Sequence, residues 1–364
     1  MNDKEAVELL KELIGTPSLS RDEGRAADIA ESFISSRCGR CKPQRAGNNI
    51  VVFPEYFDLA RPIVMLNSHI DTVKPAPSYT FDPFTPFERD GKLYGLGSND
   101  AGGSLVSLIA AFLNIKDKEL PYSLFLAISA EEEVGGENGM RHLLKFLESK
   151  GLTRIDMAIV GEPTSLQPAI AERGLLVLDC VTKGLTGHAA RNEGINAIYR
   201  AINDIVALRA CHFDKVSSVL GPIKISITQI ESGRQHNVVP DECRWVADVR
   251  TTDAYSNEET AELLRRSVSE HTTVVPRSTR VHASVISDAH PLVRSAKAMG
   301  KTPFVSPTTS DMSLMHGIPS LKIGPGESSR SHTANEFIYL TEIEQGIDSY
   351  MQLLNNLAKE LNQK

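Results

Sequence analysis

The stretch Ile63-Val64-Met65-Leu66-Asn67-Ser68-His69-Ile70-Asp71 joins a short apolar run to two polar side chains. Such a run is typical of a buried strand, and the alternation of side chains along a strand puts His69 and Asp71 on the same face. In an open α/β sheet, ligands bind outside the carboxyl ends of the strands. The position of His69 just past the run therefore predicts a binding site at that edge of a sheet.

Three further apolar runs lead to side chains that can bind a metal ion. If these runs are neighbouring parallel strands, the groups that follow them converge on one cleft although they are far apart in the sequence. Histidines combined with carboxylates suit zinc or a similar divalent ion. The runs and the groups after them are Leu124–Ile128 with Glu132 and Glu133, Met157–Val160 with Glu162, and Ile318–Ile323 with the more distant His332.

Asp100 lies in the glycine-rich segment Gly95–Gly103. The segment starts like a dinucleotide-binding fingerprint, but at the sixth position of that pattern Asp100 would place a negative charge against the phosphates. A tight glycine loop can instead present both oxygens of an aspartate, as a carboxylate that bridges two metal ions requires. Two metal ions that share a carboxylate can activate a water molecule for hydrolysis.

Three adjacent acids, Glu131, Glu132 and Glu133, follow the second run. Their mutual repulsion is compatible with a solvated acidic turn, but a nearby dication would make the cluster favourable. One glutamate could then bind the metal while its neighbour takes a proton from the activated water. His69-Ile70-Asp71 allows Asp71 to accept the second N–H of the His69 imidazole and to fix its tautomer. A polar strand end is the alternative there.

The composition is that of an ordinary globular protein, with 364 residues, 41% hydrophobic and 23% charged. A net charge of −7 argues against nucleic-acid binding. No apolar stretch approaches the ~20 residues that span a bilayer, and Met1–Glu12 is typical of a helix rather than a secretory signal. We therefore expect a cytoplasmic enzyme that does not bind membranes.

Five cysteines do not make a disulfide framework in a chain of this length. Cys38 and Cys41 form a CxxC pair, which occurs in redox and zinc sites. The pair follows the helical stretch 26–35 rather than opening a helix after a strand, and the chain has no second pair. We assign it no functional role.

The alternation of strand-like and helix-like segments predicts an α/β catalytic domain, 1–171 and 287–364, with a mainly parallel sheet between helices. The segment 172–286 has the order β-α-β-β-α-β of a ferredoxin-like unit, with Arg280–Ile286 as its last strand. We expect it to be a compact domain inserted into the larger one. The expected strands and helices of this segment are Leu175–Val181, Ile195–Leu208, Ile223–Ile230, Cys243–Val249, Glu258–Glu270 and Arg280–Ile286.

Five segments together resemble the di-zinc metallopeptidase and deacylase family that includes acetylornithine deacetylase, succinyl-diaminopimelate desuccinylase, aminoacylase and carboxypeptidase G. That family has a catalytic α/β domain interrupted by a ferredoxin-like lid or dimerisation domain. The resemblance implies an amidohydrolase with two divalent ions, zinc first and cobalt or manganese as alternatives, and a homodimer formed through the inserted domain. The segments are HIDT (69–72), DGKLYGLGSNDAGG (90–103), AEEEVGG (130–136), GEPT (161–164) and SHTANE (331–336).

The resemblance also implies a role for each matching residue. Asp100 would bridge the two ions, Glu132 would act as the general base, and Asp71 would orient His69. The histidine of the lid motif, His188, would stabilise the oxyanion, in dimeric relatives from the neighbouring subunit. Asn237 and Arg250 match positions that contact substrate, and the guanidinium of Arg250 suits an α-carboxylate. The two metal sets would be His69, Asp100 and Glu162, and Asp100, Glu133 and His332.

The substrate implied by the resemblance is an N-acyl amino acid. The Gly324-Pro325-Gly326 turn and the Leu93–Gly97 segment are more similar to acetylornithine deacetylases than to desuccinylases of the lysine pathway. N-acetyl-L-ornithine, and with it arginine biosynthesis, is therefore the first expectation. The alternatives are N-succinyl-L-ornithine, N-succinyl-diaminopimelate, a dipeptide, and a non-catalytic homologue that only binds a ligand.

Overall fold

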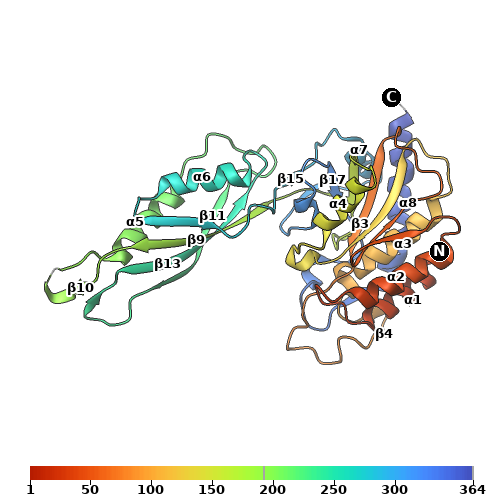
Figure 1. The fold of residues 1–364 in the computed structure, drawn as a ribbon. Helices are drawn as coiled ribbons and strands as arrows, with labels where there is room; N and C mark the ends of the chain where they lie inside the picture. Colours follow the sequence, from red (N-terminus) through yellow and green to blue (C-terminus); the bar gives the residue numbers. More distant parts are fainter. Residues whose placement is uncertain (192, 363–364) are drawn as a thin grey trace. The chain divides into compact units, whose positions relative to one another are not determined.

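The computed structural model describes residues 1–191 and 193–362, which form two compact units (Figure 1). The large unit comprises Met1–Ile170, Ile286–Ser306 and Ser310–Lys364. The inserted unit comprises Ala171–Val285 together with Pro307–Thr309. Within the described residues, no helix combines the length and the apolar character needed to cross a membrane.

The large unit is built on a mixed sheet with the strand order β1-β2-β6-β3-β7-β17-β8-β15, and β16 pairs with β8. Its centre is parallel: β3 pairs in parallel with β6 and β7, and β17 with β7. This confirms the mainly parallel sheet expected from the sequence. The strands are β1 (Pro43–Ala46), β2 (Asn49–Val52), β3 (Ile63–His69), β6 (Ser123–Ser129), β7 (Met157–Val160), β8 (Ala169–Glu172), β15 (Ser284–Val285), β16 (Phe304–Ser306) and β17 (Ser320–Lys322).

Helices cover both faces of this sheet. One core joins the sheet to α1, α2, α3, α7 and α8, and the other joins it to α4 and the short turn η4 (Asp311–Leu314). A small separate sheet of β4 (Phe87–Arg89), β5 (Lys92–Tyr94) and β18 (Phe337–Tyr339) completes the unit. The helices are α1 (Asp3–Ile14), α2 (Gly24–Arg37), α3 (Gly103–Ile115), α4 (Met140–Ser149), α7 (Pro291–Lys297) and α8 (Leu340–Asn362).

The sequence accounts for the helix that lies beside the glycine-rich loop. In α3, residues from Gly103 to Phe112 are all buried, because the helix packs against β3, α1 and α8. An L-side chain at Gly102 would place its Cβ 2.3 Å from the carbonyl oxygen of Gly97. Glycine is therefore required where this helix begins, and the Asp100 loop is held tightly against it.

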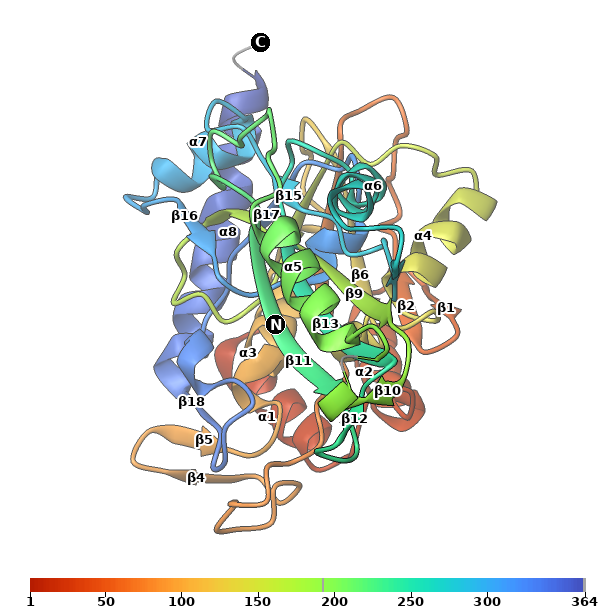
Figure 2. The ribbon, with the colours of Figure 1, turned by 90° about the vertical axis from the view of Figure 1, so that its left-hand side faces the viewer.

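The inserted unit has the element order predicted from the sequence, β9-α5-β11-β13-α6-β14. Its antiparallel sheet has the strand order β11-β13-β9-β14, as in a ferredoxin-like fold. Helices α5 and α6 pack on this sheet (Figure 2). The elements are β9 (Gly174–Lys183), α5 (Ala197–Arg209), β11 (Lys224–Ser232), β13 (Glu242–Thr251), α6 (Asn257–Ser267) and β14 (Thr272–Pro276), with a small ladder of β10 (Gly187–His188) and β12 (Val238–Val239).

The predicted last strand of this unit, Arg280–Ile286, is wrong. The fourth strand is β14 (Thr272–Pro276), whereas Ser284 and Val285 pair with β8 in the other sheet. The segment Thr272–Val275 is rich in β-branched residues, and Val274 is buried against β9. A proline at its end is tolerated because β14 lies at the edge of the sheet.

The CxxC pair lies at the carboxyl end of α2, where Cys38 and Cys41 form a disulfide with Cα atoms 5.4 Å apart. Both cysteines are buried. Cys180, Cys211 and Cys243 are free. The pair follows a helix, as the sequence indicates, and belongs to none of the potential metal-binding groups found among the described residues.

Candidate metal centre and active site

The site begins at the end of β3, where His69 and Asp71 are buried. The Nδ1 atom of His69 lies 2.9 Å from the main-chain oxygen of Asp71 and 3.5 Å from its Oδ1 atom. Because a carbonyl oxygen only accepts, Nδ1 carries a proton, so in the neutral form of the ring, which a metal ligand requires, Nε2 holds the lone pair. The ring is thereby oriented as a metal ligand, by the main chain of Asp71 as well as by its carboxylate.

The carboxylate of Asp71 also positions the acidic turn after β6. It accepts hydrogen bonds from the main-chain N–H groups of Glu132 and Glu133, at 3.0 and 3.2 Å, and from the hydroxyl of Ser20 at 2.7 Å. Although burial raises the pKa of Asp71, its contacts with His69 lower that pKa below the usual value. Asp71 is therefore an anion that connects the His69 ring to the two glutamates.

The three adjacent glutamates, 131–133, have different structural roles. Glu131 has a positive φ of 54°, and its buried side chain accepts hydrogen bonds from the main chain and the amide of Asn138. An L-side chain at Gly136 would collide with the Glu131 carboxylate. Glu131 therefore shapes the loop, and Glu132 and Glu133 are the acids left for the site.

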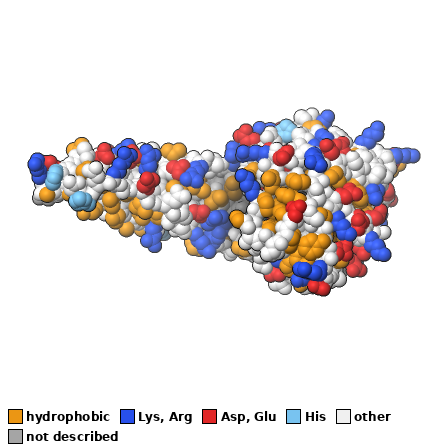
Figure 3. Space-filling view, turned by 90° about the horizontal axis from the view of Figure 1, so that it is seen from below, with side chains coloured by type: hydrophobic (Ala, Val, Ile, Leu, Met, Phe, Trp, Pro, Cys, Tyr) orange, Lys and Arg blue, Asp and Glu red, His pale blue; other side chains and the backbone are white. Residues whose placement is uncertain are grey.

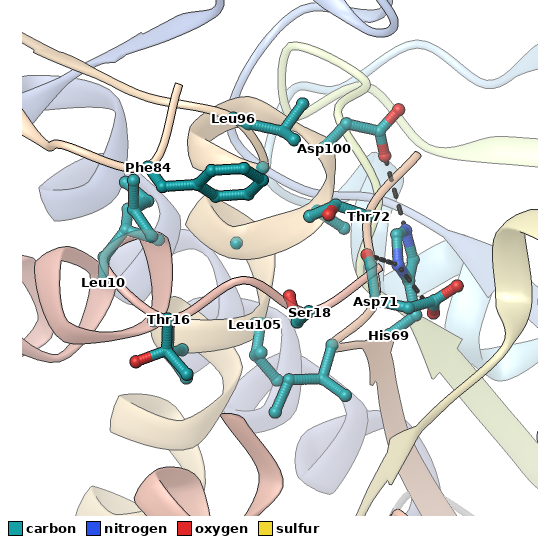
Figure 4. A pocket seen from close by; sticks show the side chains of 16 residues that line it. Leu10, Thr16, Ser18, His69, Asp71, Thr72, Phe84, Leu96, Asp100 and Leu105 are labelled. Atoms are coloured by element: carbon teal, nitrogen blue, oxygen red, sulfur yellow. Dashed lines mark hydrogen bonds and ion pairs between the residues drawn. The ribbon is translucent and has the colours of Figure 1, made fainter. Parts of the chain in front are cut away.

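Asp100 lies between the two histidines. Its Oδ1 atom is 3.4 Å from Nε2 of His69, and its Oδ2 atom is 3.6 Å from Nε2 of His332. Figure 4 shows Asp71 and Asp100 linked to different nitrogens of the His69 ring. A carboxylate that offers one oxygen to each of two imidazoles has the arrangement needed to bridge two metal ions.

Glu162 and His332 complete the two sets of donors. Glu162 follows β7, and its Oε1 atom lies 3.8 Å from Nε2 of His69. His332 has a positive φ of 58°, and its Nε2 atom lies 3.0 Å from Oε2 of Glu133. The structure thus brings together all five residues that the resemblance assigned to metal binding.

The site contains two groups of potential metal ligands, and within each group the ligand atoms lie within 4.8 Å of one another. The groups are His69 with Glu132 and Glu162, and His69 with Asp100 and Glu133. Their mixture of imidazole nitrogens and carboxylate oxygens fits two divalent ions of the zinc type. The first group contains Glu132, so proximity alone does not separate the expected base from the ligands. The division of roles between Glu132 and Glu133 stays a prediction.

The raised pKa values of several groups in the site indicate that the site favours bound cations. Burial and the neighbouring carboxylates raise the pKa of Glu132 well above its usual value, and burial raises that of Glu162 to about 8. The hydrogen bond to Glu133 raises the pKa of His332 to about 9. Glu132 and Glu162 therefore favour their protonated forms in the absence of another cation, and a bound dication would replace those protons.

A small cavity lies behind the His69 ring (Figure 4). It is lined by Asp71 and Thr72 and by apolar side chains such as Leu96 and Leu105. The hydroxyl oxygen of Thr72 is buried and makes no hydrogen bond within the described part of the chain. The predominantly apolar lining provides no further carboxylate or imidazole for a metal ion beyond His69, Asp71 and Asp100.

Two buried acids near the site have no role in the sequence analysis. Glu336 accepts hydrogen bonds from the main chain of the Asp100 loop, and burial together with the charge of Asp100 raises its pKa to about 8. Asp311 accepts a hydrogen bond from the Ser129 hydroxyl, and burial raises its pKa to about 6. Glu336 ends the SHTANE segment, which is a signal in the sequence, whereas no motif indicated Asp311.

The remaining predicted residues lie in the inserted unit. His188 pairs with Val238 in the β10–β12 ladder, and the main-chain oxygen of Asn237 accepts a hydrogen bond from Ala189 at 3.1 Å. The ladder therefore brings His188 and Asn237 together. Arg250 lies at the end of β13, where its guanidinium makes a bidentate ion pair with Asp248 at 2.8 and 3.1 Å.

Comparison with known proteins identifies the family of this chain. Residues 65–356 match the model of peptidase family M20/M25/M40. The chain is 27% identical to an acetylornithine deacetylase of Proteus mirabilis, covering 97% of this chain and 96% of that protein. It is 28% identical to a succinyl-diaminopimelate desuccinylase of Stenotrophomonas maltophilia, covering 96% and 98%.

The fold is also that of solved structures in this group. The YXEP protein of Bacillus subtilis, described as a dinuclear metal binding peptidase of the M20 family, superimposes with a TM-score of 0.74 at 15% identity. The superposition covers 98% of each chain. The motif order, the fold and the family match agree, and the chain belongs to peptidase family M20/M25/M40.

Proposed function

We propose that this protein hydrolyses the amide bond of an N-acyl amino acid, with N-acetyl-L-ornithine as the first candidate substrate and arginine biosynthesis as its setting. The observation that carries the proposal is the position of Asp100 between the two imidazoles, with one oxygen toward each. The names of the deacetylase and desuccinylase relatives support the substrate class.

The donor sets fit two divalent ions, with His69, Asp100 and Glu162 for one and Asp100, Glu133 and His332 for the other. When bound, such ions lower the pKa of a water molecule and polarise the amide carbonyl. Zinc is the first candidate, and cobalt or manganese can share the same ligands.

The residues of the chain move the protons. Glu132 takes the proton of the attacking water and later delivers it to the leaving nitrogen. Its carboxylate makes no hydrogen bond to another described residue, while its main-chain N–H is held by Asp71. The main chain of Glu132 is thus held in place, while its carboxylate oxygens are available to accept a proton.

The inserted unit supplies the groups that bind the rest of the substrate. His188 donates to the developing oxyanion, and Asn237, which the β10–β12 ladder places beside it, contacts the same part of the substrate. Arg250 binds the α-carboxylate through its guanidinium fork. Because Asp248 holds this fork in the substrate-free protein, the substrate carboxylate shares it or displaces Asp248.

One experiment tests both parts of the proposed substrate, its acyl group and its amino acid. The ratio kcat/KM is measured for N-acetyl-L-ornithine, N-succinyl-L-ornithine and N-succinyl-L,L-diaminopimelate, on zinc-loaded protein and on protein stripped with a chelator. A metal-dependent preference for the acetyl substrate supports the proposal. Preference for a succinyl substrate selects the desuccinylase alternative, which the Stenotrophomonas relative favours. Metal binding without turnover of these substrates or of dipeptides leaves a non-catalytic homologue.

We also propose a homodimer formed through the inserted unit. Strand β11 lies at an edge of its sheet and can pair with a second copy. Tyr199, Ile202 and Val206 are exposed on α5 at the spacing of one helical face. Hydrophobic side chains on the surface of the inserted unit are visible among charged ones (Figure 3).

Complementation tests both the dimer and the origin of His188. Subunits carrying Glu132→Gln are mixed and exchanged with subunits carrying His188→Ala, each variant being inactive alone. If His188 acts in the neighbouring site, half of the dimers hold one working site and about a quarter of the wild-type activity returns. No recovery in a protein that sedimentation shows to be dimeric places His188 in its own subunit's site.

A further inference from the structure

Glu336 is a buried acid that neither binds a predicted metal ion nor acts as the base. Its side chain is 2% exposed. Its two carboxylate oxygens accept hydrogen bonds from the N–H groups of Gly97, Asn99 and Asp100, at 3.0, 2.8 and 2.9 Å. The third of these donors is the main chain of the residue that faces both histidines.

The main chain around Glu336 holds the same loop. The carbonyl oxygen of Glu336 accepts a hydrogen bond from Gly95 at 3.1 Å. The side-chain amide of Asn99 in turn accepts from the N–H of Glu327 at 2.9 Å and donates to its carbonyl at 3.1 Å. The loop that carries Asp100 and the loop that carries His332 are therefore connected at several points.

The three converging N–H groups decide which side chain suits this buried position. A glutamine of nearly the same size could fill the same space. Only a carboxylate, however, offers two acceptor oxygens and no donor, which three convergent N–H groups require. The loop contains Gly95, Gly97 and Gly102, so its backbone has little intrinsic stiffness of its own.

We propose that Glu336 is the positioning residue of the bridging carboxylate: it fixes the backbone of Asp100 relative to His332 and thereby sets the spacing of the two metal sites. It acts through Asp100 and contacts neither metal nor substrate. The proposal rests on the metal centre of the proposed function. It adds a residue 236 positions from Asp100 in the chain to the groups that determine metal affinity.

The test compares Glu336→Gln and Glu336→Asp with Glu327→Gln. Glutamine replaces one acceptor oxygen with an amide N–H group that faces the three donors. Aspartate keeps the carboxylate, but its side chain is one methylene shorter, so its oxygens lie farther from the donors. Glu327 is a matched control, because it lies in the same region but its carboxylate is exposed and only approaches Arg330, at 3.7 Å. Cobalt titrations followed by visible absorption give the affinity and number of the bound ions for each protein.

Substitution of a group that orients metal ligands typically weakens metal affinity or activity by about 10–100-fold. We expect a loss of this size for cobalt in Glu336→Gln, a smaller one in Glu336→Asp, and none in Glu327→Gln. With the ions supplied in excess, kcat should fall while KM is unchanged, since substrate contacts are untouched. Wild-type affinity for both ions in a folded Glu336→Gln protein, or an equal loss in the control, would overturn the proposal.

Hydrogen exchange of metal-free protein separates this proposal from the proposed function. The segment 95–103 should exchange faster in Glu336→Gln or Glu336→Asp than in wild type, with other segments unchanged. Unchanged exchange in this segment refutes the role of Glu336 even if the enzyme is a metallohydrolase. Wild-type protein that binds no cobalt refutes the metal centre, and faster exchange in the variants would then leave Glu336 with a structural role only, which also overturns the proposal.

Discussion

Glu132→Gln tests the division of labour between the two adjacent glutamates. The substitution removes a titratable oxygen but keeps the shape of the side chain. The structure predicts little damage to the fold, because the Glu132 carboxylate makes no hydrogen bond to another described residue and only its main-chain N–H is held, by Asp71 at 3.0 Å. A general base typically contributes about 10²–10⁴-fold to the rate. Turnover should therefore fall by that factor, or about 3–5 kcal/mol of activation free energy.

The same substitution should have the opposite effect on stability. The pKa of Glu132 is raised well above its usual value, chiefly by burial and then by the charges of Glu162, Asp311 and Glu133. The folded state therefore binds a proton that the unfolded state releases once the pH exceeds about 4.5, the usual pKa of a glutamate. Stability then decreases as the pH rises toward the folded pKa. A neutral glutamine avoids this loss, so metal-free Glu132→Gln should be more stable than wild type at pH 8, and the difference should vanish near pH 4.

The assay has three readouts, measured for Glu132→Gln and for Glu133→Gln. These are the turnover of the best substrate, the metal content after dialysis, and the thermal unfolding of the metal-free protein at pH 4 and pH 8. We expect Glu132→Gln to keep both metal ions, whereas Glu133→Gln loses the carboxylate that lies 3.0 Å from His332 and binds metal more weakly. Metal loss confined to Glu132→Gln would show that the two roles are exchanged. Turnover of Glu132→Gln within tenfold of wild type would refute its role as the base.

Three further outcomes can be measured. His188→Ala should lower kcat by about 10²–10³-fold, as removal of one oxyanion donor typically does, and a loss much below tenfold would contradict its role. Arg250→Lys should raise KM by about 10–100-fold, the value of a charged hydrogen bond, for substrates with a free α-carboxylate, and not for their amides. Because the pKa values of His332 and Glu162 are raised to about 9 and about 8, metal binding must displace protons at neutral pH. Affinity should therefore rise from pH 6 to pH 9, with proton release seen by calorimetry in buffers of different ionisation enthalpy, and a pH-independent affinity would contradict this assignment.

The positions of the expected ligands could be predicted because they depend on a simple property of parallel sheets. Buried runs in β3, β6, β7 and β17 end at one edge of the sheet, so the groups after them meet there. This reasoning needs only apolar runs and the polar residues that follow. The resemblance then supplied the specific roles, and the structure brought all five expected ligands together.

Other features depend on contacts that leave no local pattern. From the residue pattern alone, without the resemblance, Glu131 could not be distinguished from its two neighbours; its positive φ and its hydrogen bonds from Asn138 show its separate role. The strand β14 was missed because its β-branched run is short and ends in Pro276, which argues against an interior strand. A proline is tolerated in β14 because this strand lies at the edge of its sheet. The sequence of residues 272–276 does not reveal that position, because it does not specify the order of the strands. Asp311 approaches the site only because η4 packs beside the sheet.

The arrangement of carboxylates links the function of the site to its folding. Glu132, Glu162 and Glu336 all have raised pKa values because burial and neighbouring acids oppose their charges. In the metal-free protein these groups weaken the fold as the pH rises through their range. Divalent ions reverse the sign of the local electrostatics, since each carboxylate then faces a cation. Metal binding should consequently stabilise this edge of the sheet most at alkaline pH, and the acids that make the metal-free site unfavourable are the ones that give the loaded site its affinity.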